Sequence, residues 1–241
     1  MTQGPFFVTL KDRGLIKITG ADRHNFLQKI ITNDIDLLAK QEALYTCLLT
    51  PQGKFLHDFF ISQQESSTLH IDCEGGERTL DLQEHLQKYK LHADIEIQAE
   101  PAIPFYAIFG LAFGYKDPRH EQMGYRAYQR PIGITEMPFE EWDYQRISLG
   151  IPDGSRDMIV GKTTMDEARI AQLNGLSYDK GCYIGQELTA RMHYRGLGKR
   201  HLRCVKLNDM PENAQLRSSC RDLGIALTPH NTVKPNIPNN R

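Results

Sequence analysis

The spacing of apolar residues in the first part of the chain predicts short strands alternating with short helices. Residues 15–20 form an apolar run closed by glycine, which is typical of a strand. After Asp22, a candidate helix N-cap, apolar residues recur at helical spacing as far as Ile31. The apolar runs 43–49 and 55–61 flank the turn-forming sequence Thr-Pro-Gln-Gly-Lys, so they predict a β-hairpin.

The middle of the chain continues this alternation. Residues 68–73 alternate as a strand, and residues 80–89 form an amphipathic helix. His85 lies beside the apolar face of this helix, so we expect a surface or boundary residue rather than a ligand. Residues 115–131 are polar and rich in turn-forming residues, which favours a surface connection between two parts of the fold.

The last third of the chain predicts one more helix and a small β module. Residues 139–149 show helical spacing and are followed by Gly-Ile-Pro. Residues 201–207, 215–219 and 224–228 predict short strands. The last residues, 229–241, contain three prolines and four asparagines, and we expect a loose tail there.

Composition narrows the class of protein. The chain has 241 residues, of which 40% are hydrophobic and 24% charged, enough for one large domain or two small ones. The net charge of −1 gives no reason to expect a nucleic-acid-binding polycation. The five cysteines are odd in number, widely spaced and without a Cys-x-x-Cys pair. They support neither a disulfide framework nor a zinc knuckle, so we expect reduced thiols and predict no metal site.

Nothing in the sequence predicts attachment to a membrane. The longest apolar runs fall short of the roughly 20 residues that span a bilayer. Residues 1–11 lack a basic region followed by a long apolar run. We therefore expect a cytoplasmic protein with no membrane partner.

The strongest candidate for chemistry is the octapeptide Lys-Gly-Cys-Tyr-Ile-Gly-Gln-Glu, residues 180–187. Glycines on both sides of Cys182 suit a tight turn, and a helix is predicted to begin at Gln186. The neighbouring Lys180 and a helix N-terminus would both favour the thiolate, the reactive form of cysteine. The alternative is that Cys182 is a small buried hydrophobic residue, as many single cysteines are.

This octapeptide resembles the K-G-C-[FY]-x-G-Q-E signature of the YgfZ-like folate-binding proteins. They are relatives of the glycine-cleavage T-protein, a tetrahydrofolate-dependent aminomethyltransferase. Two other stretches carry the same resemblance: residues 14–34, and the hairpin sequence L-L-T-P-Q-G-K-x-L-x-D that ends at Asp58. The resemblance spans roughly residues 14–61 and 146–202.

The resemblance implies an α+β fold, with interleaved mixed α/β lobes around a central folate pocket and a shortened C-terminal β module. The corresponding division of the chain is a folate-binding, aminomethyltransferase-like core over residues 1–200, a short β module over 201–228 and a loose tail over 229–241. The alternation of strands and helices agrees with a mixed fold, but it does not give this topology.

The resemblance also implies catalytic candidates. In the aminomethyltransferases the hairpin carries a pair of acids that supplies a catalytic carboxylate, and here the pair is His57-Asp58. Asp58 is therefore a catalytic candidate beside Cys182 and Lys180. The missing first acid counts against aminomethyl transfer, because a carboxylate would steady the cation that develops in that reaction.

A second group of residues is expected to bind the folate. Glu167, in the sequence Met-Asp-Glu-Ala, matches the glutamate that grips the pterin ring in T-protein relatives. A carboxylate can accept two N–H groups of an aminopyrimidine edge, although a solvated helix residue is the alternative. The other candidates are Asn33, Asp34, Gln186 and Glu187. A capping turn is the alternative for Asn33 and Asp34.

Residues 189–206 form a basic run without acidic side chains, and Tyr194 lies within it. Such a run is compatible with phosphate or polyglutamate contact, and a solvated surface is the alternative. Because cellular folates often carry glutamate tails, we expect Arg191 and Arg195 to contact the folate tail. We do not expect direct binding of nucleic acid.

These inferences predict a protein that binds tetrahydrofolate or another reduced folate and supports the assembly or repair of iron–sulfur enzymes, including the radical enzymes that modify tRNA. Iron–sulfur enzymes or cluster-assembly proteins would be its partners, and this part rests on the resemblance alone. The alternative is a tetrahydrofolate-dependent aminomethyltransferase. Whether the protein is an enzyme therefore stays open, with folate-dependent one-carbon transfer as the candidate reaction. An RNA-binding module is the third interpretation.

Overall fold

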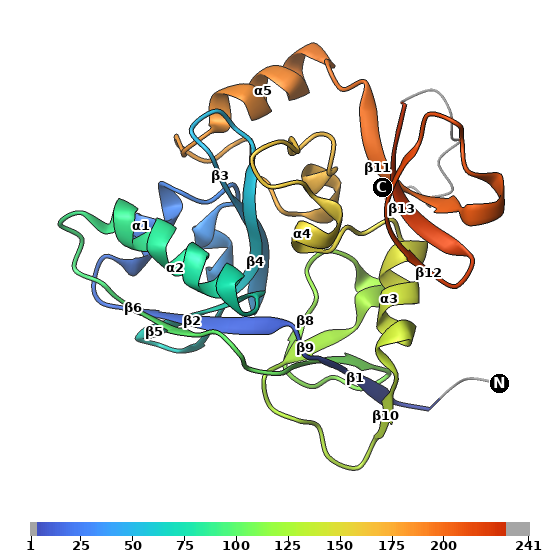
Figure 1. Ribbon diagram of the computed structural model, residues 1–241. Coiled ribbons are helices and arrows are strands. Elements are labelled where there is room, and N and C mark those ends of the chain that lie inside the picture. The colour runs from blue at the N-terminus through green and yellow to red at the C-terminus, as the bar shows by residue number, and fades with distance from the viewer. Residues whose placement is uncertain (1–3, 230–241) are drawn as a thin grey trace.

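The computed structural model describes residues 4–229 and arranges them in three β-sheets joined by short helices (Figure 1). This arrangement confirms the predicted α+β class. The tail predicted over residues 229–241 lies, apart from Pro229, outside the described residues. None of the helices within residues 4–229 combines the length and the apolar character needed to cross a membrane.

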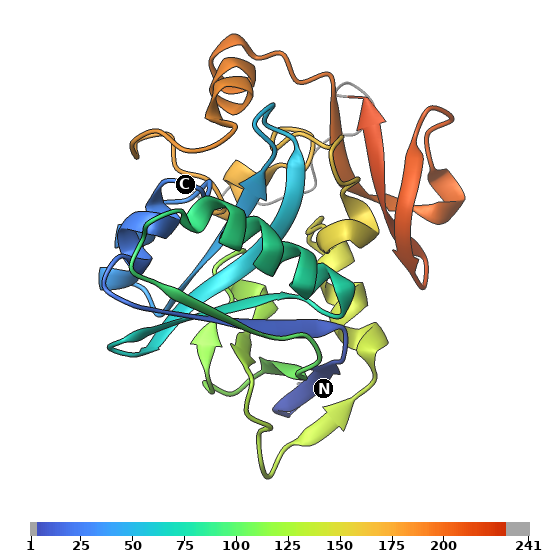
Figure 2. The ribbon, with the colours of Figure 1, turned by 60° about the vertical axis from the view of Figure 1, so that its left-hand side comes forward.

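The first sheet contains five antiparallel strands in the order β3-β4-β5-β2-β6. Their bounds are β2 Arg13–Thr19, β3 Ala43–Leu49, β4 Phe55–Glu65, β5 Thr68–Glu74 and β6 Glu96–Glu100. The predicted hairpin is confirmed, because β3 and β4 pair directly. α2 (Glu77–Lys90) lies across one face of this sheet (Figures 1 and 2), where Leu82 and Leu86 enter the apolar core. α1 (Arg23–Gln28) and the 3-10 helix η1 (Ile35–Ala39) add residues to the same core.

The second sheet has the strand order β10-β1-β7-β9-β8. Its strands are β1 Phe6–Leu10, β7 Phe105–Phe109, β8 Tyr115–Lys116, β9 Tyr125–Ala127 and β10 Thr135–Met137. β1 belongs to this sheet, whereas β2 begins three residues later in the first sheet. The chain therefore passes from one sheet to the other at residues 11–12, which interleaves the two halves.

The surface connection predicted over residues 115–131 is wrong. This segment supplies β8, β9 and the 3-10 helix η2 (Glu121–Met123), and two of its arginines are almost fully buried: Arg119 is 3% exposed and Arg126 is 1% exposed. Buried arginines are stable only with charged partners. The partners of these arginines are brought to them by the tertiary structure. The sequence of the segment shows only that it is polar, and a polar segment is typical of the surface.

The third sheet is formed by β11 (Arg200–Lys206), β13 (Leu223–Pro229) and β12 (Gln215–Cys220), in that order. The three short strands predicted near the end of the chain are confirmed. α3 (Phe139–Ser148) packs against this sheet, and the apolar core here is continuous with that of the second sheet. The domain boundary predicted between residues 200 and 201 stays a prediction.

Four short elements complete the described chain: α4 (Gly154–Asp157), η3 (Ile170–Leu173), α5 (Gln186–Arg195) and η4 (Leu207–Asp209). The predicted helix start at Gln186 is confirmed. Figure 1 shows α5 at the upper end of the molecule, standing outside the sheets. Gly196 ends α5 with a φ of +59°, a left-handed conformation that suits glycine.

Candidate functional site

A cavity of about 970 Å³ lies between the first two sheets and the helices α3 and α4. Its walls come from β1 and the connection to β2, from β4 and β5, from the segment around β8 and β9, and from both helices. Acidic and basic side chains line it in equal number. Its volume lies in the range of small-molecule binding sites.

A buried cluster of charges forms one wall of the cavity. Asp72 of β5 accepts hydrogen bonds from Arg13 Nε at 2.7 Å, from Arg126 Nε at 2.9 Å and from the Tyr115 hydroxyl at 3.0 Å. Burial acts to lower the pKa of Arg126, but Asp72 and its neighbours raise that pKa above its ordinary value. The Arg126 guanidinium is therefore charged and held in one orientation.

Arg119 is a second buried guanidinium at this wall. It donates to both oxygens of Asp117, from Nε at 3.0 Å and from Nη2 at 2.8 Å. Arg119 Cζ lies 4.7 Å from the centre of the Phe60 ring, and Arg126 Cζ lies 4.2 Å from it. With a carboxylate and an aromatic face as partners, each arginine is in place before a ligand enters.

Two carboxylates converge beside Gly154, on the α4 side of the cavity. A Cβ atom on Gly154 would lie 3.4 Å from Asp58 Oδ1 and 3.1 Å from Glu74 Oε2. Asp58 is 8% exposed and accepts a hydrogen bond from the Tyr45 hydroxyl at 2.9 Å. Burial raises the pKa of Asp58 to about 6. This carboxyl group can therefore act in hydrogen bonding or proton transfer near neutral pH.

An aromatic wall faces the cavity from α3. Phe139 and Trp142 both line it, and their ring centres lie 5.3 Å apart. Among the described residues, the buried Trp142 Nε1 has no hydrogen-bond partner. The Arg156 guanidinium lies 5.5 Å from the centre of the Phe139 ring. A flat heterocycle can contact these rings while its polar edge meets the charged wall.

Of the predicted site residues, all of which the structure describes, Asp58 alone lines this cavity. Most of the others belong to the octapeptide loop or to the elements beside it. Lys180 fixes that loop, because its Nζ donates to the carbonyls of Ile31 at 2.9 Å and Asn33 at 2.7 Å. Burial lowers the pKa of Lys180 to about 8, and Asp34 and Asp36 act against this.

Asn33 and Asp34 form the capping turn that was the alternative to a folate contact. Asn33 Nδ2 donates to the carbonyls of Tyr45 and Asn174, both at 2.8 Å. An Asp34 side-chain oxygen accepts the backbone N–H of Asp36 at 3.1 Å, at the start of η1. Both side chains are thus bound within the chain, and their contact with a folate stays a prediction.

Cys182 lies in the octapeptide loop with its side chain exposed. Gln186 closes the loop: its Oε1 accepts the backbone N–H of Tyr183 at 2.8 Å, and its Nε2 lies 3.8 Å from Cys182 Sγ. Glu187 and Arg191 form an exposed ion pair one turn apart on α5. The exposure of Cys182 rules out the buried alternative, whereas its chemical role stays a prediction.

The octapeptide loop contacts the turn of the β3–β4 hairpin through two glycines. A Cβ atom on Gly185 would lie 2.5 Å from the carbonyl oxygen of Thr50, and one on Gly53 would lie 2.7 Å from the carbonyl oxygen of Gly185. Both glycines also have positive φ angles. Two segments that carry the family resemblance therefore meet where their backbones leave no room for a side chain.

Glu167 lies outside the cavity lining and is bound to Thr164. The Thr164 N–H donates to Glu167 Oε2 at 2.8 Å, while the Glu167 N–H donates to Thr164 Oγ1 at 3.1 Å. This reciprocal pair is a capping box at the start of a helical turn. Its sequence signature, Thr-x-x-Glu, was present in the chain and indicates this structural role for Glu167.

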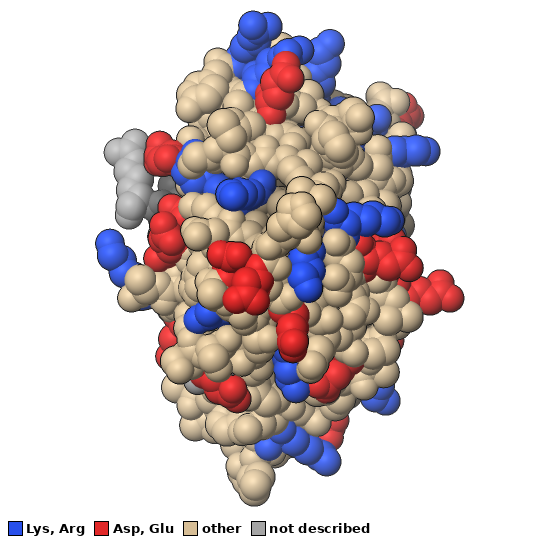
Figure 3. Space-filling model, turned by 90° about the vertical axis from the view of Figure 1, so that its left-hand side faces the viewer, with Lys and Arg blue, Asp and Glu red and all other residues tan. Residues whose placement is uncertain are grey.

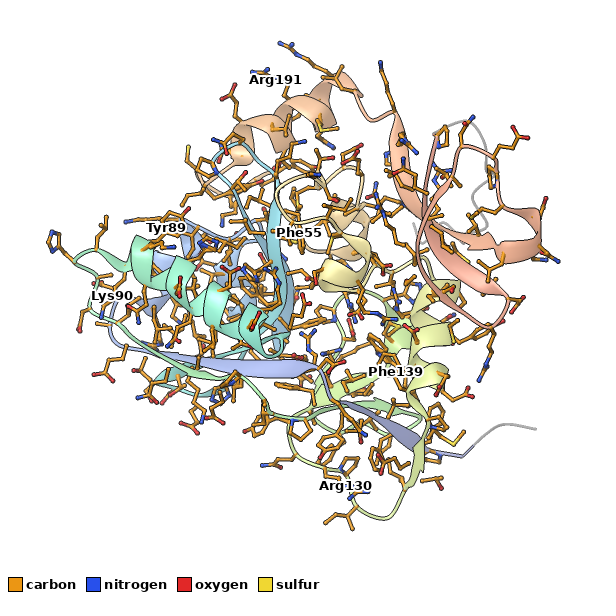
Figure 4. The ribbon with its side chains drawn as sticks, in the orientation of Figure 1. Phe55, Tyr89, Lys90, Arg130, Phe139 and Arg191 are labelled. Carbon is orange, nitrogen blue, oxygen red and sulfur yellow. The ribbon has the colours of Figure 1, made fainter. Side chains whose placement is uncertain are left out.

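The basic run lies on the surface, with Arg191, Tyr194 and Arg195 exposed. Figure 3 shows blue side chains gathered at the upper end of the molecule, where Figure 1 places α5. In Figure 4 the side chain of Arg191 lies on the outer side of α5, far from Phe139 at the beginning of α3. The basic run and the cavity are thus separate regions.

Several residues of the cavity were not predicted from the sequence: Glu74, Arg119, Arg126 and the aromatic residues on α3. Glu74 ends a strand, and the two arginines lie in a polar, turn-rich segment. A weak signal was the sequence Tyr-Arg-Ala at residues 125–127, which sets one arginine between residues that favour burial.

Comparisons with known proteins point to iron–sulfur cluster assembly factors. No family model matches the chain. The chain is 29% identical over 235 residues to the mitochondrial iron–sulfur cluster assembly factor IBA57 of Homo sapiens, covering 83% of this chain and 66% of that protein. The Mus musculus IBA57 is 27% identical (82% and 65%), and the Pyricularia oryzae IBA57 homolog is 28% identical (83% and 57%). The chain thus spans between about half and two thirds of the length of the relatives it matches.

These relatives correct one expectation. All three are named as mitochondrial proteins, which contradicts the cytoplasmic location expected from the sequence. Among solved structures, the glycine cleavage system aminomethyltransferase T of Bartonella henselae superposes with a TM-score of 0.69, covering 94% of this chain and 78% of that one at 13% identity. The chain therefore has the aminomethyltransferase T fold.

Proposed function

We propose that this protein binds a reduced folate in the cavity and supports the assembly of iron–sulfur proteins. The observation that carries the proposal is the cavity itself, which combines two aromatic rings, an available carboxyl group and fixed guanidinium groups. The names of the relatives support the link to iron–sulfur cluster assembly. The sequence resemblance to YgfZ-like folate-binding proteins supports the choice of ligand.

The residues of the cavity fit a folate. Asp58 can accept N–H groups from an aminopyrimidine edge, and Phe139 and Trp142 offer rings for contact with the flat pterin. Arg119 and Arg156 can pair with the carboxylates of a glutamate tail. In this proposal Asp58 takes the role that the sequence suggested for Glu167, because the Glu167 carboxylate is bound to Thr164.

Fluorescence of the single tryptophan tests the proposal directly, because Trp142 lines the cavity. Tetrahydrofolate should quench it saturably, and Asp58→Asn should weaken binding by about 10- to 100-fold through the loss of a charged hydrogen-bond acceptor. Glu167→Gln is the control and should bind like the parent. Weaker binding in Glu167→Gln together with unchanged binding in Asp58→Asn would assign pterin binding to Glu167. If tetrahydrofolate did not quench the parent, the folate proposal would be refuted.

Cys182 is proposed as the residue through which the protein acts on its client proteins. Its thiol is exposed and does not line the cavity, and it can therefore meet another protein. The octapeptide loop that carries it is fixed by Lys180 and Gln186. Restoration of iron–sulfur enzyme activity in cells that lack this protein, by the parent and by Cys182→Ser, tests this role.

One observation favours aminomethyl transfer as a second candidate function. The sequence offered one acid at the hairpin, but Glu74 of the neighbouring strand brings a second carboxylate beside Asp58 near Gly154. Two carboxylates at one wall can steady a cation that develops on the bound one-carbon unit. Formation of methylenetetrahydrofolate from an aminomethyl-lipoyl protein would support this activity, and its loss in Glu74→Gln would assign the second acid.

A further inference from the structure

Three side chains of metal-binding type converge between α2 and β4. His57 of β4 is 2% exposed, and it faces Asp81 and His85, which lie one turn apart on α2. Successive residues of a strand point to opposite faces of a sheet, so His57 faces α2 while Asp58 faces the cavity. This cluster is therefore separate from the cavity, and its role does not depend on the proposed function.

The distances in this cluster suit a single ion. His57 Nε2 lies 2.9 Å from Asp81 Oδ2, and His85 Nε2 lies 3.9 Å from Asp81 Oδ1. Each residue offers one potential metal-ligand atom, and these three atoms lie within 4.8 Å of one another. Donors that share an ion at bond lengths of about 2.0–2.2 Å lie roughly 3–3.6 Å apart. Binding of one ion would require the three atoms to close from within 4.8 Å to that spacing.

Hydrogen bonding within the chain accounts for only part of this arrangement. The His57–Asp81 contact uses one carboxylate oxygen, and the gap between the other oxygen and His85 is wider than a hydrogen bond. Arg78 Nη1 donates to the first oxygen at 3.0 Å. It positions the carboxylate and leaves Oδ1 directed toward His85, as residues behind a metal ligand do.

We propose that His57, Asp81 and His85 bind one divalent transition-metal ion. Two imidazoles and one carboxylate are suitable donors for Zn²⁺, Fe²⁺ or Co²⁺, whereas Mg²⁺ and Ca²⁺ require more oxygen ligands. Asp81 and His85 have side chains that are 46% and 24% exposed, so water can complete the coordination and the ion can enter from solvent. The bound ion ties α2 to the first sheet.

Titration with Co²⁺ tests this site, using the whole chain after treatment with a chelator, at about pH 7.5, where the imidazoles are neutral. The parent should bind one equivalent, with visible ligand-field bands and no sulfur-to-cobalt charge-transfer band in the near ultraviolet. His85→Gln and Asp81→Asn should each weaken binding by more than about 100-fold, since each removes a ligand. Zn²⁺ should displace Co²⁺ and raise the melting temperature of the parent but not of these two variants.

Two matched control variants test whether other side chains that could bind Co²⁺ account for the binding. His92→Gln changes an exposed histidine that lies just after α2, and Cys182→Ser removes the exposed thiol. Both should bind Co²⁺ as the parent does. Binding that survives in His85→Gln and Asp81→Asn but is lost in Cys182→Ser would overturn the proposal, as would the absence of binding by the parent at micromolar ion.

Discussion

The cavity and the octapeptide loop are built in opposite ways. The cavity is lined by buried charges that are held in place by ion pairs, such as Arg13 and Arg126, which both donate to Asp72. The octapeptide loop exposes Cys182 and is held mainly by bonds to backbone atoms, such as those from Lys180 to two carbonyls. In the cavity, the residues proposed to bind the folate belong to the same network that stabilises the fold. At the loop the thiol can change without loss of any buried contact.

The largest effect is expected at the charged wall of the cavity. Asp72→Asn leaves two buried guanidinium groups without their carboxylate, and this should lower the free energy of unfolding by about 3–5 kcal/mol. Urea unfolding followed by circular dichroism measures this. Lys17→Met breaks an exposed ion pair with Glu100 and is the control, with an expected change below about 1 kcal/mol. Equal effects of the two variants would contradict the contrast between buried and exposed charges.

A medium effect is expected at Gly154. Its φ of +47° disfavours any side chain, and a methyl group would press on the carboxylates of Asp58 and Glu74. Gly154→Ala should cost about 1–2 kcal/mol in the free energy of unfolding and should also weaken folate binding. Gly133 also has a positive φ, +80°, but open space around it, so Gly133→Ala should cost stability while folate binding stays unchanged. Unchanged folate binding by Gly154→Ala would place the ligand elsewhere.

A smaller, pH-dependent effect is expected at Lys180. Because burial lowers its pKa to about 8 from 10.5, the unfolded chain holds more protons than the native one between these two values. The stability of the parent should therefore rise with pH across this interval. In Lys180→Met that contribution should be absent, although the variant loses two hydrogen bonds and is less stable throughout. Parallel stability profiles for the parent and the variant above pH 8 would refute the lowered pKa.

The smallest effect on stability is expected at Cys182. Cys182→Ser should change the free energy of unfolding by less than about 0.5 kcal/mol, because the side chain is exposed. A loss of activity in the cellular complementation test at an unchanged melting temperature would then show a role in function. Alkylation of the native protein should modify Cys182 far faster than the buried Cys47 and Cys73. Full complementation by Cys182→Ser would leave the octapeptide with a structural role alone.

Several features could be predicted from the sequence because they depend on neighbours along the chain. Turn-forming residues between two apolar runs predicted the β3–β4 hairpin, and glycines before Gln186 predicted the start of α5. The capping box of Thr164 and Glu167 can also be predicted from the sequence, because its two residues lie three positions apart. Asp58 was found through the family resemblance of the hairpin sequence that contains it, and it lines the cavity.

The residues that line the cavity are brought together by the tertiary structure and could not be predicted from the local sequence. Arg13 and Arg126 meet at Asp72 although they lie 59 and 54 positions from it along the chain. Burying a charge is unfavourable unless a partner is at hand, and no local pattern shows which partner the fold will supply. For the same reason residues 115–131 were predicted as a surface connection, whereas the boundary position predicted for His85 is confirmed by its 24% exposed side chain. The sequence alone determined the β3–β4 hairpin, the strands of the third sheet and the start of α5, while the packing of the sheets determined which charges face one another.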